Sequence, residues 1–334
     1  GNISAEGMHV TTLTETADCL RDLGRLDEAA SIYQGAIRRN EELGRERSVA
    51  VSKGQLGTVR LRQNRFDEAL TAYKEALTIF ESLGEPVTVA VAWHQIGRVH
   101  SETGRLDLAE EAYRQSLAIE VKTKNLEGEA TSLGELGNLY SAWGRLEEAV
   151  TFKRQAADAY NRLHNLSREG LSRSNLAITL IELRRYDEAR REVLQAIECK
   201  ALLGQAAQIW KTWNALCDLE KATGNYIAAD AARQKGIESY LAYRRAGGVS
   251  QHNRFDLFAL VTNALQENQA EVALQQLAQI SAEDIPQWLR SLIAKLQAIL
   301  QGDRSPSLAD DPSFSYTTVV ELQLLLDQNP LPNA

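Results

Sequence analysis

Histidine and cysteine are the residue types in this chain whose spacing could support metal or nucleophilic chemistry. The 334 residues include 5 histidines and 3 cysteines. His94 and His100 are separated by about 600° of helical rotation, so their rings would lie on different faces and could not bind one metal ion. Cys19, Cys199 and Cys217 are too scattered for a disulfide framework or a CxxC site. We expect buried thiols, a reducing compartment, no metal and no cofactor.

Sequence motifs offer no anchor for catalysis either. The chain contains no GxxxxGK[ST] phosphate loop, no HExxH and no GxSxG motif. Acidic residues are abundant, but most of them recur at matching positions along the chain, which is typical of solvated surface charge. We therefore expect no catalytic residues and no enzymatic activity.

Composition and charge favour an all-helical protein that binds neither nucleic acid nor membranes. Aromatic residues make up 6% of the chain and there are only 6 prolines. The net charge is -8, and no Lys/Arg block could neutralise several phosphates of a nucleic acid. The sequence also lacks a run of about 20 apolar residues and a signal-peptide core. These features predict a cytoplasmic protein.

One short phrase, Gly-Arg-Leu-Asp-Glu-Ala or a close variant, recurs at a fixed interval of 40 residues. Its copies begin at Gly24, Asn64, Gly104, Gly144 and Arg184, and a degenerate sixth copy begins at Gly224. A series of small residues keeps the same interval: Ala17, Gly57, Gly97, Gly137, Ala177 and Cys217. Small side chains let two helices approach closely, so each unit is predicted to be a helix pair.

The third unit illustrates the predicted pair. A first helix is expected from about Val87 to Glu102 and a second from about Leu106 to Lys122, because apolar residues recur three or four positions apart. Gly104 and Arg105 form the turn between the two helices. Glycines at 44, 84 and 204 are expected to end the second helices of other units.

Two stretches then resemble a known repeat. Leu136-Gly137-x-x-Tyr140 followed by Ala149, and Leu56-Gly57 with Ala69, Tyr73 and Ala76, look like the tetratricopeptide (TPR) signature. The likeness spans about residues 8–246, although Lys153, Val193 and Arg233 replace the aromatic that follows the alanine. The 40-residue period is similar to Leu-Gly-Asn repeat scaffolds, kinesin light chains and the sensor arrays of bacterial NTPases.

The resemblance implies an all-α, right-handed superhelical solenoid of about six helix hairpins with a C-terminal helical cap. First helices would line a concave groove that binds a peptide or helix of another protein. Helical offsets from the small-residue series place Val51, Gly54, Thr58 and Leu61 on this inner face in the second unit. The predicted partner-binding residues are His94, Arg98, Ser101, Thr131, Asn138, Ser141, Leu171, Ser174, Ile178, Ile181, Asn214 and Asp218.

Several of these positions are unusual for a solvated helix face. Leu171, Ile178 and Ile181 would form an apolar patch, which we expect a partner, the protein's own tail or a second copy to cover. Gly54 and Gly134 each cost about 1 kcal/mol inside a helix. Either a ligand backbone approaches them or, more commonly, adjacent helices pack tightly there. The lysines of a carboxylate clamp are absent.

We divide the chain into a repeat array (1–246), a helical segment (247–301), a linker (302–316) and a terminal apolar helix with its tail (317–334). Three helices are expected between Arg254 and Gln301, and one from Thr317 to Asp327. The last helix is expected to dock on the final repeats as a cap. A free helix that binds a partner is the alternative.

The function predicted from these features is that of a protein–protein interaction module. One alternative is the regulatory sensor portion of a larger bacterial NTPase or signalling protein, and another is a peptide-pheromone receptor. The sequence does not identify the partner, its direction in the groove, the oligomeric state or the host. It also leaves open whether the chain is a fragment.

Overall fold

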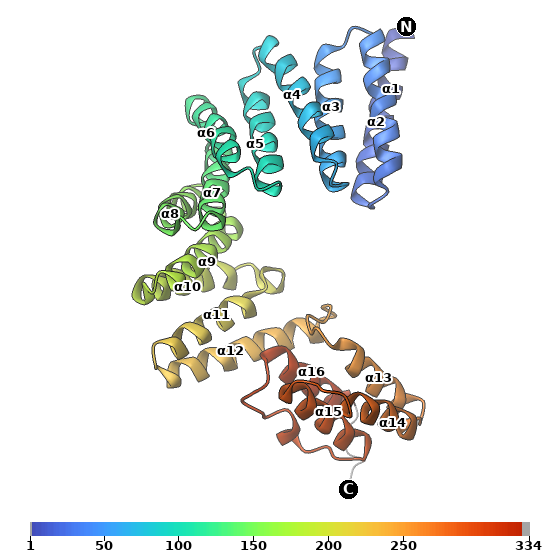
Figure 1. Cartoon of the computed structure of the whole chain (residues 1–334), viewed down its shortest axis with the longest axis vertical. Helices are drawn as coiled ribbons and strands as arrows, with labels where there is room; N and C mark the ends of the chain where they lie inside the picture. The colour runs from blue at the N-terminus through green and yellow to red at the C-terminus, as the bar shows by residue number, and fades with distance from the viewer. Residues whose placement is uncertain (1, 329–334) are drawn as a thin grey trace. The chain divides into compact units, whose positions relative to one another are not determined.

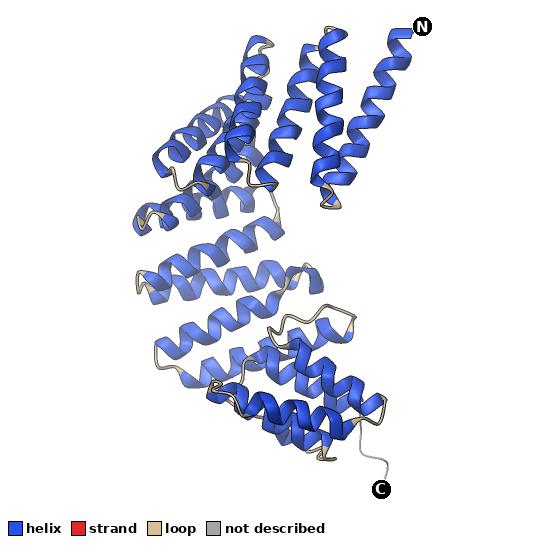
Figure 2. Ribbon diagram, turned by 45° about the vertical axis from the view of Figure 1, so that its right-hand side comes forward, coloured by secondary structure: helices blue, strands red, loops and turns tan. Residues whose placement is uncertain are grey.

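The computed structural model describes residues 2–328, and within that range the side chains of residues 2–11, 205–206 and 255 are not described. Throughout the described part the chain is helical, without a strand (Figure 2). The helices are α1 (Asn2–Asp22), α2 (Leu26–Glu42), α3 (Glu46–Arg62), α4 (Phe66–Ser82), α5 (Pro86–Glu102), α6 (Leu106–Thr123), α7 (Leu126–Ala142), α8 (Leu146–Arg162), α9 (Leu166–Glu182), α10 (Tyr186–Ala201), α11 (Ile209–Ala222), α12 (Tyr226–Arg245), α13 (Phe255–Gln266), α14 (Ala270–Ser281), α15 (Gln287–Leu300) and α16 (Tyr316–Gln328). Two 3-10 turns, Gly204–Ala207 and Pro306–Leu308, complete the elements.

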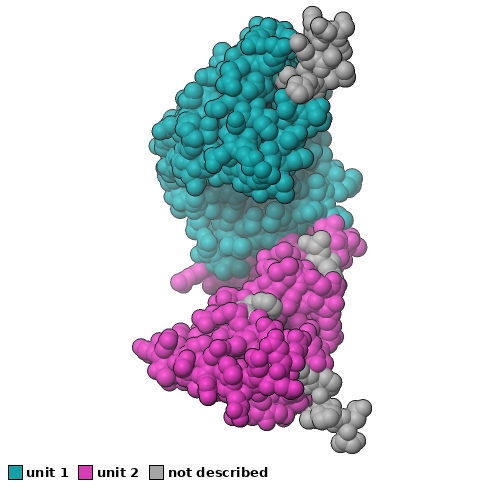
Figure 3. All heavy atoms as spheres, turned by 90° about the vertical axis from the view of Figure 1, so that its right-hand side faces the viewer, with its two compact units in different colours: residues 1–183 teal, residues 184–334 magenta. Residues whose placement is uncertain are grey.

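The helices pack in successive antiparallel pairs, as the 40-residue period predicts, so the all-α solenoid is confirmed. The chain forms two compact units, residues 1–183 and 184–334 (Figure 3). Unit 1 contains α1 to α9, and unit 2 contains α10 to α16. The domain boundaries placed at 246, 301 and 316 stay predictions.

Left-handed residues end the helices of the array at intervals of 20 residues. Gly44, Gly84 and Gly204 have φ of 66°, 67° and 67°, which confirms their predicted role as helix ends. The residue that follows bonds back across the turn, as where the Arg65 N–H donates to the Arg60 carbonyl over 2.8 Å. Lys124 takes the same conformation with φ of 57° although it carries a side chain. That position is therefore strained.

The small-residue series packs each first helix against its partner. A Cβ at Gly57 would lie 2.8 Å from the Tyr73 ring, and one at Gly97 would lie 2.7 Å from the Tyr113 ring. At Gly137 the neighbour is the Cγ atom of Lys153, 2.6 Å away. The lysine stem therefore occupies the place of the tyrosine rings. The close helix pairing predicted from these positions is confirmed.

Unit 2 joins the last helix pair of the array to the C-terminal helices. Its core contains Trp210 and Tyr240 from the array and Leu292 from α15. Helix α16 packs against α12, where the Arg244 guanidinium binds the buried Glu321 carboxylate over 2.8 Å. The docked form predicted for the terminal helix is thus confirmed, and the free helix is wrong.

Arg233 explains why the sixth unit departs from the repeat. Its guanidinium stands where other units have an aromatic ring, and it donates to the backbone carbonyl of Phe314 over 2.7 Å. The predicted contact of the last repeat with the C-terminal region is confirmed. The expectation of buried cysteines holds for Cys199 and Cys217 but is wrong for Cys19, which is exposed.

Candidate functional site

Among the described residues of unit 1, three hollows share one arrangement. Each is bounded by two successive odd-numbered helices, with the even-numbered helix between them as its floor. Figure 1 shows α5, α7 and α9 on the inner side of the curve that unit 1 follows. We call the face formed by α1, α3, α5, α7 and α9 the inner face. Hollows that repeat along it are what a groove for an elongated ligand requires.

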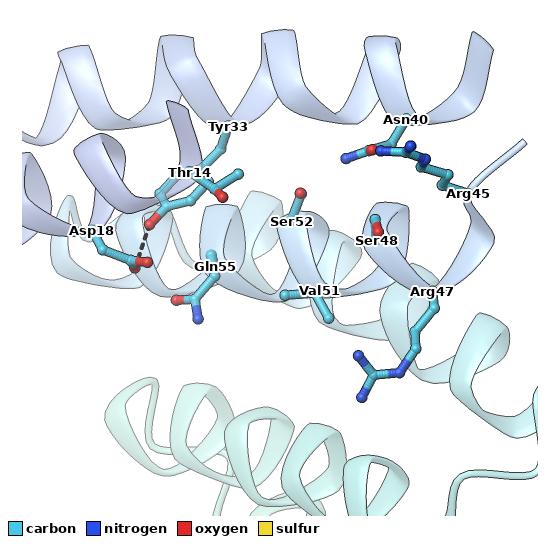
Figure 4. A pocket seen from close by; sticks show the side chains of 10 residues that line it. All are labelled: Thr14, Asp18, Tyr33, Asn40, Arg45, Arg47, Ser48, Val51, Ser52 and Gln55. Atoms are coloured by element: carbon cyan, nitrogen blue, oxygen red, sulfur yellow. Dashed lines mark hydrogen bonds between the residues drawn. The ribbon is translucent and has the colours of Figure 1, made fainter. Parts of the chain in front are cut away.

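The first hollow lies between α1 and α3, has a volume of about 220 Å³ and is mainly polar (Figure 4). The Tyr33 hydroxyl donates to the Asp18 carboxylate over 2.6 Å. Arg21 donates to the same carboxylate and to the Gln55 side chain, each over 2.7 Å. Burial, followed by the Asp18 hydrogen bond, raises the pKa of Tyr33. These groups already satisfy one another, so the hollow is largely self-contained.

The second hollow, about 320 Å³, lies between α3 and α5 above α4, and we call it the Gly54 hollow. A Cβ at Gly54 would have no other atom within 4 Å, so the expectation of tight helix packing there is wrong. Val51 and Val91 stand at its walls, 40% and 52% exposed. Beneath them Tyr73 is buried, and its hydroxyl lies 3.0 Å from the Thr58 hydroxyl.

The third hollow, about 120 Å³, lies between α7 and α9 and is called the Gly134 hollow. It brings together three predicted partner-binding residues, Thr131, Asn138 and Leu171. The Thr131 hydroxyl lies 3.1 Å from the Tyr160 hydroxyl, and Asn138 is exposed. The Cβ of a residue at Gly134 would touch only Ala156, at 3.9 Å, so tight packing is wrong here too.

Lys153 lines this third hollow with an unusual environment. Its ammonium group donates to Ser141 over 2.7 Å and to Thr179 over 2.8 Å. Burial lowers the pKa of Lys153, with a smaller opposing effect of Glu182. Ser141, a predicted partner-binding residue, is therefore half-buried and bonded to the lysine rather than free for a ligand.

The corresponding place between α5 and α7 is occupied by the chain itself. His94 stands 40 residues after Gly54 and 40 before Gly134, and its ring centroid lies 5.6 Å from that of Tyr113. Burial lowers the pKa of His94 to about 4, so the ring is neutral at pH 7. Burial raises the pKa of the nearby repeat-equivalent carboxyl, Glu135.

The other predicted partner-binding residues are more dispersed. Arg98 donates to Gln95 over 3.0 Å, and Ser101 is half-buried on the same helix, α5. Ser174, Ile178 and Ile181 lie on α9; Ile178 is 50% exposed, Ile181 is half-buried, and the Ser174 hydroxyl donates to the Gly170 carbonyl. Asn214 donates to Asp218 over 3.2 Å on α11, which belongs to unit 2.

The predicted set omitted the residues of the Gly54 hollow. Val51, Gly54 and Thr58 had been placed on the inner face, and all three line this hollow. Leu61 had been placed there as well, but it is only 4% exposed and belongs to the core with Ile96. The glycine inside a helix was the signal that could have identified the hollow.

Two further features bear on what this site can do. The described side chains include no cluster of three or more His, Cys, Asp or Glu suited to a metal ion. Within the same part of the chain, no helix is apolar over enough residues to cross a bilayer.

Comparison with solved structures shows the same fold. BtubC (BKLC) from P. vanneervenii has a TM-score of 0.59 and 19% identity, covering 66% of this chain and 92% of that chain. The TPR-like repeats of a putative kinesin light chain from Podosopora anserina have a TM-score of 0.51 and 20% identity, covering 58% and 96%. A Signal Transduction ATPase with Numerous Domains protein with a TPR sensor, from Pyrococcus horikoshii, has a TM-score of 0.60 and 16% identity, covering 71% and 37%.

Sequence comparison identifies the family. No curated protein sequence is similar enough to count as a match. Tetratricopeptide repeat models match residues 9–82 and 88–162, residues 55–119, and residues 171–207, which together are more than half of the chain. The match agrees with the helix pairs and the small-residue packing described above. The chain belongs to the tetratricopeptide repeat family.

Proposed function

We propose that the inner face of unit 1 binds a segment of another polypeptide, so that the protein acts as an interaction module. The observation that carries the proposal is the recurrence of hollows at one repeat-equivalent place, between α1 and α3, α3 and α5, and α7 and α9. A row of equivalent hollows suits a ligand that is itself elongated and repetitive, as a polypeptide backbone is.

The side chains along this face suit a polypeptide ligand. Gln55, Gln95 and Asn175 occupy one repeat position, are half-buried and line hollows. Amide side chains both donate and accept hydrogen bonds, so they match the N–H and C=O groups of a bound backbone. Exposed Leu171 and Ile178, each 50% exposed, would supply apolar contact beside them.

The proposal is tested by selecting ligands from a displayed random-peptide library on the immobilised chain. Enriched peptides are synthesised, and their affinities are measured for the unmodified chain and for Asn138→Trp on α7. Asp158→Trp is the matched control, because Asp158 is equally exposed but lies on α8. We expect Asn138→Trp to weaken binding about tenfold or more, and Asp158→Trp to leave it unchanged. The reverse pattern would refute binding at the inner face.

The predicted apolar patch on α9 has a test of its own. Ile178→Asp places a charge on a half-exposed position, so the fold should persist while binding of a selected peptide is lost. Unchanged affinity with an unchanged helical circular dichroism spectrum would exclude the patch from the binding site.

A role as the sensor portion of a larger signalling ATPase is the second candidate. Its support is the similarity to the Pyrococcus horikoshii protein with a TPR sensor, which covers 71% of this chain. The test is the gene itself: a phosphate-loop ATPase encoded in the same reading frame would favour the sensor. A reading frame without one would leave the interaction module as the better description.

A further inference from the structure

We propose that the Gly54 hollow binds an uncharged aromatic side chain of the partner polypeptide. This proposal rests on the proposed function, since it names one side chain of the segment that the inner face would bind. It also makes residue 54, and its repeat equivalents, the positions that decide which hollows are open.

The space exists because residue 54 is a glycine. Nothing lies within 4 Å of the place a Cβ would occupy, and the hollow has a volume of about 320 Å³. Glycine inside a helix is unfavourable, so its presence at an open rather than a crowded position is not explained by packing. Val51 and Val91 on facing helices leave apolar surface exposed beside the opening.

The chemistry of the walls selects an uncharged group. None of the described residues that line the Gly54 hollow is charged, and Ala50, Ala76 and Phe80 supply apolar surface. The other two hollows differ, since one contains Asp18 and Arg47 and the other contains Glu135 and Arg168. A charged ligand group would lose its hydration in the Gly54 hollow without gaining a partner.

The repeat itself indicates the shape of the occupant. One unit further along, the chain's own His94 fills the equivalent place with a neutral planar ring, 5.6 Å from Tyr113 and inclined by 57°. Tilted ring pairs at such a separation are favourable. Tyr73 is the repeat equivalent of Tyr113 and forms part of the Gly54 hollow. A partner's ring that enters this hollow would meet Tyr73 as His94 meets Tyr113.

The test uses N-acetyl-phenylalaninamide as a probe at millimolar concentration, with methyl NMR of the full chain as the readout. We expect shifts of the Ala50, Ala76 and Val91 methyl signals. Gly54→His, which places the ring of unit three in unit two, should weaken the probe at least about tenfold. Gly134→His is the matched control and should leave the probe unaffected, because it fills the hollow between α7 and α9.

A second variant guards against misfolding of Gly54→His. Val91→Glu puts a charge on a side chain that is 52% exposed at the wall, so it should fold and should also lose the probe. Probe binding that survives both variants would overturn the proposal. So would N-acetyl-leucinamide binding as tightly as the aromatic probe.

The two proposals fail separately. If library-selected peptides bind at the inner face but the aromatic probe does not shift the Gly54 hollow, only the present inference is overturned. If the probe binds in the hollow but no peptide can be selected, the proposed function is overturned and the aromatic site stands.

Discussion

Two glycines on α3, three residues apart, should respond to the same substitution with opposite signs. At Gly54 an added Cβ meets no other atom within 4 Å, so Gly54→Ala gains only helix propensity, about 1 kcal/mol of unfolding free energy. At Gly57 the added Cβ would lie 2.8, 2.9 and 3.0 Å from three Tyr73 ring atoms. Overpacking of this kind costs about 1–3 kcal/mol, which outweighs the same propensity gain.

The assay is urea unfolding of the two variants and the unmodified chain, followed by helical circular dichroism. We expect Gly54→Ala to unfold at higher urea than the unmodified chain and Gly57→Ala at lower urea, with a difference between the variants of roughly 1–3 kcal/mol. Because both sites share one helix, differences in solvent exposure of the backbone largely cancel. Equal stability of the two alanine variants would refute the close packing of α3 against Tyr73.

Three further predictions concern strain, proton binding and a buried ion pair. Lys124→Gly should raise the unfolding free energy by about 1 kcal/mol, because Lys124 holds a left-handed φ of 57°; thermal unfolding checks it, and no gain would argue against strain there. Burial lowers the pKa of His94 from 6.5 to about 4, so the unfolded chain takes up this proton first. Relative to His94→Gln, stability should therefore be constant above about pH 7 and fall by roughly 3 kcal/mol between pH 6.5 and 4, and a flat difference would contradict burial. Arg244→Leu should destabilise unit 2 by about 3–5 kcal/mol in denaturant unfolding, since it leaves the Glu321 carboxylate buried without its partner; a neutral effect would contradict that ion pair.

The fold could be predicted from the sequence because its information is periodic. The helix expected from Val87 to Glu102 is Pro86–Glu102 in the structure, and the one expected from Leu106 to Lys122 is Leu106–Thr123. The glycines at 57, 97 and 137 announced the helix contacts, since only a missing side chain lets a Tyr ring or a Lys stem come so close.

The hollows could not be predicted in the same way. Helical periodicity tells which face a residue lies on, but not whether a neighbouring helix covers it. Leu61 shows this, because it has the offset of an inner-face residue and is nevertheless buried with Ile96 in the core. Gly54 shows the converse, since its helix position suggested packing and the structure leaves space there. Whether a hollow is open depends on side chains from three helices at once.

Hydrogen–deuterium exchange of the full chain with a saturating library-selected peptide tests most directly whether the inner face is the binding surface. The account predicts slower amide exchange in α3, α5, α7 and α9, with the even-numbered helices unchanged on their outer side. Protection confined to α4, α6 and α8, or to the helices after α12, would contradict it.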